Sequence, residues 1–202
     1  MSNQDQSWGI LPTQQDEDNT RAHAVSDPAG YHAGIAGREL HWFDGNTQSW
    51  ISQTDTGEWA GWHDRDASSA HADASWQPWS HPLDDSLAPY YRWFVDGQTN
   101  ACFNLIDRHV LSGRGDQIAI VFEGDRWDPS KNDGRGGPVH EQRVTYRELL
   151  VEVALRTRVL KQADLSCGDR VALNLPNVLE QIFYILACQR LGVIYTPVFG
   201  GF

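Results

Sequence analysis

The most regular pattern of apolar and polar positions lies near the carboxyl end of the chain, in residues 165–202. A short apolar run over Arg170–Leu175 follows a Gly-Asp turn signal and stops at a proline, which predicts a strand. Over Val178–Leu191 the apolar residues recur every three or four positions, which predicts a helix. A second apolar run, Val193–Phe199, predicts another strand.

Two residues define the ends of the predicted helix. Asn177 can cap its first free N–H groups, and Gly192 can take the left-handed conformation that ends it. Strand, helix and strand make a βαβ unit with parallel strands and a right-handed crossover. Parallel strands are covered on both faces, and one such unit cannot supply that cover. We therefore expect the chain to be the front part of a longer protein, truncated at Phe202.

Upstream, the pattern predicts one helix and then one strand. Asn100 can cap a helix whose apolar positions include Phe103 and Ile106, and Gly113 can end it. The run Gln117–Glu123 is the clearest isolated strand. The polar stretch that follows, RWDPSKNDGRGGPVHEQ, holds three glycines and two prolines and predicts a long loop.

A capping box opens the next helix. Thr145 and Glu148 stand three residues apart ahead of an apolar series that fades near Asp164. From Gln117 onward the predicted order is strand, loop, short strand, helix, strand, helix, strand. This alternation is typical of an α/β fold.

The first half of the chain has a different pattern. Residues 1–26 are mostly polar and predict a mobile polar arm, and Asp27-Pro28 predicts the start of a helix towards Leu40. Between residues 44 and 85, five tryptophans stand among Gly, Ser, Asp and His, with few aliphatic residues. We expect a loop-rich layer whose tryptophans dock onto a larger body, because it has too few aliphatic residues for a core of its own. The predicted class is thus α/β, with a loop-rich α+β extension in front.

Charge separates the same two halves. Residues 1–100 hold 4 Arg and no Lys against 15 Asp and Glu, whereas residues 101–202 hold 12 basic and 12 acidic residues. This balance argues against nucleic acid and against anionic membrane surfaces as partners. Three separate cysteines without CxxC spacing, and the lack of any long apolar stretch, favour the cytoplasm.

Few residues suggest chemistry by themselves. The eight histidines do not fall in metal-ligand spacing, and there is no G-x-x-x-x-G-K-[ST] phosphate loop. Asp107-Arg108-His109 could orient a catalytic group, although an ion pair or a partly buried structural network is the favoured interpretation. Two glycines after a parallel strand, in the terminal Phe199-Gly200-Gly201, permit a sharp turn and close approach of a ligand to the backbone. On spacing alone, a plain tight turn is the favoured interpretation.

Five segments resemble, in the same order, the N-terminal region of acyl-CoA synthetases of the acetyl-CoA synthetase type, in the AMP-forming adenylating superfamily. They are RWFVDGQTNACFNLIDRHVL, RVTYRELL, GDRVALNLPN, LACQRLG and TPVFGGF. The resemblance covers about residues 86–202, with a weaker one at 27–42. It implies a polar arm (1–26), a Trp-rich synthetase N-terminal extension (27–88) and the start of the AMP-binding large domain (89–202).

Within this family, EGDRWDPS, GRGGPV and LDDSLAPYYRWF are similar to the propionyl-CoA synthase subfamily of fused enzymes, whose first domain activates 3-hydroxypropionate. The resemblance implies a ligase that uses ATP, Mg and CoA on a small carboxylic acid. Its partners would be the remainder of the ligase and, in that subfamily, fused hydratase and reductase domains, the latter with NADPH. Self-association into a homo-oligomer stays open.

By resemblance, the turn at Phe199, Gly200 and Gly201 lies against the adenine nucleotide part of CoA. The family's phosphate loop, hinge aspartate and catalytic lysine belong to later positions and do not occur in residues 1–202. No catalytic residue and no metal ligand is therefore assigned, and we expect this piece alone to be inactive. Two alternatives stay open: a piece of an acetyl-CoA synthetase, and a non-catalytic Trp-rich docking or binding module.

Overall fold

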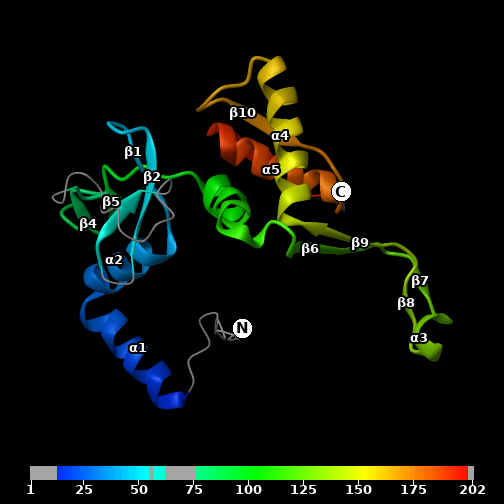
Figure 1. Ribbon diagram of the computed structural model, residues 1–202, viewed down its shortest axis with the longest axis horizontal. Helices are drawn as coiled ribbons and strands as arrows, with labels where there is room; N and C mark the ends of the chain where they lie inside the picture. The colour runs from blue at the N-terminus through cyan, green and yellow to red at the C-terminus, as the bar shows by residue number, and fades with distance from the viewer. Residues whose placement is uncertain (1–12, 55–56, 62–75, 200–202) are drawn as a thin grey trace. The chain divides into compact units, whose positions relative to one another are not determined.

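The computed structural model describes residues 13–54, 57–61 and 76–199 of the chain (Figure 1). They fall into two compact units, unit 1 (Met1–Thr99) and unit 2 (Asn100–Phe202). Helices and strands are mixed along the chain, so the predicted α/β class is confirmed.

The two units meet later in the sequence than the expected boundary between residues 88 and 89. Strands β4 (His81–Asp84) and β5 (Arg92–Val95) pair antiparallel across that point, with Leu83 opposite Trp93. Arg92 also forms an ion pair with Asp84. This hairpin keeps both strands in unit 1 and moves the division to Thr99 and Asn100.

Two helices open unit 1. The described part of the predicted polar arm is not an irregular segment but helix α1 (Gln14–Ser26), in which no residue is buried. Its helical form follows from local interactions, because Thr13 caps it and Arg21 pairs with Glu17 one turn earlier. Residues 1–12 of the arm lie outside the described residues. Helix α2 (Pro28–Glu39) confirms the predicted start, since the Asp27 carboxylate accepts the N–H of Gly30 at 2.9 Å.

The loop-rich layer predicted for residues 44–85 is wrong for the described residues 44–54 and 57–61. Short strands β1 (Trp42–Asp44), β2 (Ser49–Gln53) and β3 (Trp59–Gly61) form an antiparallel sheet in that order. Asp44 sets the first turn by accepting the Asn46 N–H and the Thr47 hydroxyl. Short alternating runs between such turns are sufficient for strands of three to five residues.

The tryptophans of unit 1 pack mainly against one another. Trp42 and Trp79 meet edge to face with ring centres 4.8 Å apart, and Trp79 lies 5.0 Å from Phe94. Trp59 contacts Trp79 at 5.9 Å. Trp42 is buried and donates its indole N–H to the carbonyl of Ala36. These rings thus form a small aromatic core in place of an aliphatic one. Trp50, Trp59, Trp76 and Trp79 are only half-buried, so their docking onto a larger body stays a prediction.

Unit 2 begins with a helix that contains two π-helical segments, η1 (Phe103–Asp107) and η2 (Val110–Arg114). The predicted cap is confirmed, since the Phe103 N–H donates to Asn100 Oδ1 at 3.1 Å. Gly113 takes a positive φ of 83°, as expected for the helix end. Apolar positions three and four residues apart fit α and π turns alike, so their spacing could not predict the wider turn.

Strand β6 (Ile118–Glu123) pairs antiparallel with β9 (Glu141–Thr145). The polar stretch between them is not a plain loop. Strands β7 (Trp127–Asp128) and β8 (Gly137–Pro138) pair within it around the short helix α3 (Lys131–Gly134). Asp128 accepts hydrogen bonds from the Ser130 N–H and hydroxyl, which start the turn between the two strands. The glycines of this stretch predicted a loop but did not indicate this turn.

Helices α4 (Tyr146–Gln162) and α5 (Leu179–Leu191) supply most of the core of unit 2. The capping box at the start of α4 is confirmed: the Glu148 N–H donates to Thr145 Oγ1, and the Thr145 N–H donates to Glu148 Oε2 at 2.8 Å. The Asn177 cap is wrong, because the residue at the N-cap of α5 is Val178, which makes no side-chain cap. The core contains the following buried residues: Cys102, Ile106, Val144, Leu149, Val153, Leu160, Leu179, Phe183, Leu186, Ala187, Cys188 and Val193.

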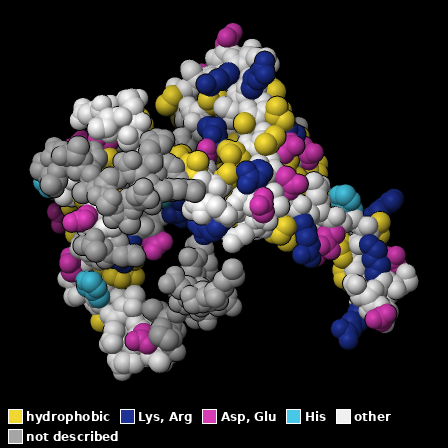
Figure 2. All heavy atoms as spheres, viewed as in Figure 1, with side chains coloured by type: hydrophobic (Ala, Val, Ile, Leu, Met, Phe, Trp, Pro, Cys, Tyr) yellow, Lys and Arg dark blue, Asp and Glu magenta, His cyan; other side chains and the backbone are white. Residues whose placement is uncertain are grey.

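Strands β10 (Arg170–Leu173) and β11 (Ile194–Pro197) run parallel on either side of α5 in the sequence, which confirms the βαβ unit. Val171 and Tyr195 pack against the core of unit 2, whereas Ile194 is about half exposed on the other side of the sheet. Helix α4 also has an apolar stripe outside the core, at Val151, Leu155 and Val159, and apolar side chains gather over this region in Figure 2. Among the described residues, one face of the parallel pair is thus left open.

His109 is buried against the start of α4. Its ring centre lies 4.6 Å from that of Tyr146, and 6% of the residue is exposed. Burial lowers the pKa of His109 to about 4, and the nearby positive charges of Arg114 and Arg108 act in the same direction. The folded protein therefore holds this ring neutral.

Replacing Thr145 by Ala removes the cap of α4 and is expected to lower the free energy of unfolding by about 1 kcal/mol. Urea unfolding followed by far-UV circular dichroism measures this loss. Thr145→Ser keeps a hydroxyl in the same place and should retain most of the stability. Equal losses in the two variants would show that the hydroxyl does not cap the helix.

The buried His109 predicts a pH dependence of stability. Below pH 6.5 the unfolded chain binds a proton at this residue that the folded chain does not bind until about pH 4. The free energy of unfolding therefore falls as the pH falls, by about 2 kcal/mol from this residue between pH 7 and pH 5. The glutamine of His109→Gln cannot bind a proton in this range. The fall in its free energy of unfolding between pH 7 and pH 5 should therefore be about 2 kcal/mol smaller than in the wild type.

The matched control is His140→Gln, at an exposed histidine of the same unit. Its free energy of unfolding at pH 7 should stay within about 0.5 kcal/mol of the wild-type value. A fall in stability between pH 7 and pH 5 that is the same in His109→Gln as in the wild type would contradict the assignment to His109.

Candidate functional site

The carboxyl ends of β10 and β11 form the first candidate site. The strands are parallel, so both end at one edge, with Leu173 opposite Pro197. The Val198 N–H donates to the carbonyl of Leu173 at 2.9 Å and extends the pairing by one residue. Phe199 follows directly and is 70% exposed. In open α/β sheets this edge is where ligands bind.

Of the three residues predicted to bind a cofactor, the structure places one. Phe199 lies just beyond the carboxyl edge, as the sequence predicted from the βαβ pattern. Gly200 and Gly201 lie outside the described residues. Their contact with a ligand remains a prediction.

A glycine fixes the path from α5 into β11. Gly192 has a φ of +71°, and a Cβ at this position would come within 2.8 Å of Cys167 Sγ. Its carbonyl accepts the Gly168 N–H, and the next residue, Val193, donates to the carbonyl of Cys188. A side chain at residue 192 would therefore disturb both the turn and the approach to β10.

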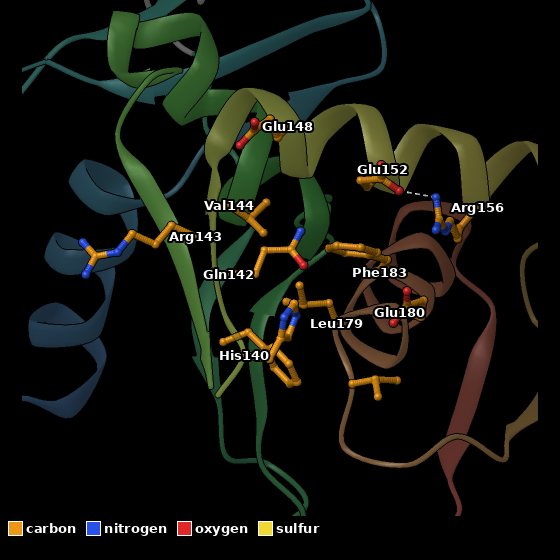
Figure 3. A pocket seen from close by; sticks show the side chains of 12 residues that line it. His140, Gln142, Arg143, Val144, Glu148, Glu152, Arg156, Leu179, Glu180 and Phe183 are labelled. Atoms are coloured by element: carbon orange, nitrogen blue, oxygen red, sulfur yellow. Dashed lines mark hydrogen bonds and ion pairs between the residues drawn. The ribbon is translucent and has the colours of Figure 1, made fainter. Parts of the chain in front are cut away.

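The second candidate is a hollow of about 510 Å³ between β9, α4 and the start of α5 (Figure 3). Its apolar side consists of Val144, Leu179 and Phe183, with charged side chains around them (Figure 3). The complete lining is Phe122, His140, Gln142, Arg143, Val144, Glu148, Glu152, Arg156, Val178, Leu179, Glu180 and Phe183. Sequence reasoning missed this hollow, because the lining comes from four elements between residues 122 and 183.

The charges of the hollow are engaged with their neighbours. Arg156 pairs with Glu152 one turn away and lies over the ring of Phe183, 5.3 Å from its centre (Figure 3). Glu148 accepts from Thr145, and these hydrogen bonds lower the pKa of its carboxyl group. Glu148, Glu152 and Arg156 follow one another at four-residue spacing, which is the one signal in the sequence that could have indicated a common face. The arrangement stabilises α4 and offers little for acid–base chemistry.

The cluster Asp107-Arg108-His109 lies in the interior of unit 2. Arg190 donates two hydrogen bonds to Asp107, from Nη1 to Oδ1 at 3.1 Å and from Nη2 to Oδ2 at 2.5 Å. Burial alone would lower the pKa of Arg190, but the bond to Asp107 and the neighbouring Cys102 raise it overall. The geometry favours the interpretation as a structural network.

In the described ranges, no group of three or more His, Cys, Asp or Glu residues could hold a metal ion. His63 and His71 lie outside those ranges. None of the helices described is both long and apolar enough to cross a membrane.

Comparison with known proteins assigns both parts of the sequence. Residues 108–202 match the model of the AMP-binding enzyme family. Residues 67–105 match the model of the acetyl-coenzyme A synthetase N-terminus, which spans the division between the two compact units.

Individual relatives agree with this assignment. The chain is 42% identical to acetyl-coenzyme A synthetase of Methylobacillus flagellatus over 137 residues, which are 67% of this chain and 19% of that protein. It is 42% identical to the Mycobacterium bovis enzyme of the same name over 130 residues, 63% of this chain and 18% of that protein. The chain thus spans about a fifth of the length of these relatives. Residues 108–202 are thus similar to AMP-binding enzymes, and the segment before them is similar to the acetyl-coenzyme A synthetase N-terminus.

Proposed function

We propose that the chain is the N-terminal part of an ATP-dependent, AMP-forming acyl-CoA ligase. In the first step of the proposed reaction, a carboxylate attacks the α-phosphate of ATP and releases pyrophosphate. In the second, the CoA thiol attacks the acyl carbon of the adenylate and releases AMP and a proton. The observation that most supports this proposal is the match of residues 108–202 to the AMP-binding enzymes.

The complete enzyme would use ATP, Mg and CoA. Phe199, Gly200 and Gly201 would receive the adenine nucleotide part of CoA. The position of Phe199 just beyond the carboxyl edge of the parallel pair supports this role, because ligands bind at this edge in open α/β sheets. Adenylation also needs a phosphate cradle and a cation for the developing charge, which we expect from the remainder of the ligase. The cytoplasm is the compartment that fits the unpaired cysteines.

Two small acids are candidates for the substrate. The segments EGDRWDPS and GRGGPV favour 3-hydroxypropionate and a propionyl-CoA synthase, with fused hydratase and NADPH-dependent reductase domains. The relatives named acetyl-coenzyme A synthetase support acetate equally well. The β7–β8 hairpin holds the GRGGPV segment, so this hairpin is one described part that would differ between the two subfamilies.

A docking role for unit 1 is the second candidate function. Leu87, Tyr90, Tyr91 and Trp93 are exposed large apolar residues within seven positions. The other described tryptophans contact aromatic neighbours inside the unit, which argues against a stacking platform for sugars. The exposed segment fits a contact with another protein surface.

The ligase proposal predicts acid-dependent exchange of pyrophosphate into ATP by the complete protein that contains this chain. Acetate, propionate and 3-hydroxypropionate should be compared by kcat/KM, and the preferred acid identifies the subfamily. Residues 1–202 alone should show no exchange. Acyl-adenylate formation by the 202-residue chain, or no exchange by the complete protein with any small acid, would contradict the proposal.

Phe199→Ala tests the CoA site in the complete protein. Loss of one stacked ring should raise the KM for CoA about tenfold, while pyrophosphate exchange without CoA stays within about twofold. Tyr91→Ala, at an exposed aromatic residue of unit 1, should change neither quantity. An unchanged KM for CoA in Phe199→Ala would remove this residue from the site.

A further inference from the structure

One side chain at the start of unit 2 caps two helix ends at once. Asn100 Oδ1 accepts the Phe103 N–H at 3.1 Å and so caps the helix that contains η1. Asn100 Nδ2 donates to the carbonyls of Gln189 at 3.3 Å and Arg190 at 3.1 Å, in the last turn of α5. The last carbonyls of a helix lack the usual partners within it, and Asn100 supplies a donor to two of them. The Gln189 carbonyl also accepts the Gly192 N–H at 3.4 Å.

An ion pair joins the same two helices beside this cap. Asp107 and Arg190 are linked by two hydrogen bonds, and their side chains are only 17% and 26% exposed. Cys102, which is fully buried, lies next to the Arg190 guanidinium. Two parallel bonds between a guanidinium and a carboxylate fix direction as well as distance. We call Asn100, Asp107 and Arg190 the α5 clamp.

The clamp holds the part of α5 that leads directly into β11. Gln189 and Arg190 are followed by Leu191, the left-handed Gly192 and Val193, whose N–H still bonds to the last turn at Cys188. Ile194 then begins the strand, and its N–H donates to the carbonyl of Asp169 next to β10. A shift of the last turn of α5 would therefore move β11.

Strand β11 has one neighbour among the described strands, β10. Its position accordingly depends on that pairing, on the packing of Tyr195 against the core of unit 2 and on the end of α5. The strand ends at Pro197, two residues before Phe199. The geometry thus connects the clamp to Phe199 through one strand of four residues.

We propose that Asn100, Asp107 and Arg190 are positioning residues for the CoA step. They fix the end of α5 and, through Gly192 and β11, the position of Phe199 relative to CoA. The assignment to CoA depends on the proposed function, whereas the mechanical coupling from the clamp to β11 does not. The clamp residues are partly buried by one another at the end of α5, so we assign them a positioning role through β11 and not a contact with the ligand.

Asn100→Ser in the complete protein separates the two caps. Serine retains an N-cap oxygen for the first helix but has no amide to donate to the α5 carbonyls. The KM for CoA should rise about three- to tenfold, while acid-dependent pyrophosphate exchange measured without CoA stays within about twofold. Asp107→Asn, which leaves the Arg190 charge without its counter-charge, should act in the same direction.

The matched control is Asp116→Asn. Asp116 pairs with Arg147 in an exposed ion pair of the same unit, so the same chemical change should leave both quantities at the wild-type values. Equal losses in exchange and in CoA turnover for Asn100→Ser, or an unchanged KM for CoA, would overturn the proposal. A purely structural role lowers both half-reactions together and does not raise KM for one substrate.

Hydrogen exchange of the same proteins, read by mass spectrometry, tests the coupling independently of activity. In Asn100→Ser, peptides covering residues 189–198 should exchange faster, whereas peptides of α4 should not change. If the wild-type protein shows no pyrophosphate exchange, the proposed function fails but this measurement still decides the coupling. An unchanged rate of hydrogen exchange over residues 189–198 would refute the coupling between the clamp and β11.

Discussion

The contact between α4 and α5 is the interaction on which unit 2 depends. Val153 on α4 and Phe183, Leu186 and Ala187 on α5 are buried in one apolar core, and both strands of the parallel pair pack against it. Burial of a large apolar side chain contributes about 1.5–3 kcal/mol, so a core of this size outweighs any single surface ion pair described here. The helix termini then decide where the strands begin. Thr145 sets the start of α4, and Gly192 with Asn100 sets the end of α5.

Unit 1 reaches stability in a different way. Its sheet has short strands, and Ile51 and Trp42 are among its few buried large residues. Edge-to-face contacts between tryptophans replace the aliphatic packing of unit 2, and the orientation of each ring is fixed by its neighbours. Such a core is small and specific. It explains how an acidic segment with few aliphatic residues can have a defined structure.

Features set by local chemistry were predictable from the sequence. The Thr145 capping box, the Asp27 cap and the left-handed Gly192 follow from residue type and spacing within a few positions. The βαβ order was predictable from periodicity, and with it the place of Phe199 at the carboxyl edge.

The features that were missed depend on contacts between distant residues. The tryptophan cluster joins residues 42 to 94, and the Asn100 amide reaches carbonyls about ninety positions away. No periodicity reports such contacts. The Asn177 cap was predicted from the capping propensity of asparagine alone. It was wrong because α5 begins one residue later, with Val178 at the N-cap. The π turns were missed because the apolar spacing does not distinguish them from α turns.

The open face of the β10–β11 pair and the outer stripe of α4 have a consequence for synthesis. If the chain continues as far as its relatives do, these residues leave the ribosome well before the polypeptide that would cover them. Apolar strands that stay exposed until the covering segments are synthesised are prone to pair with other chains. The polar β7–β8 hairpin and the acidic unit 1 precede them in translation, and like charges on neighbouring nascent chains repel one another. On that condition, the negative charge of the first half would oppose association between nascent chains.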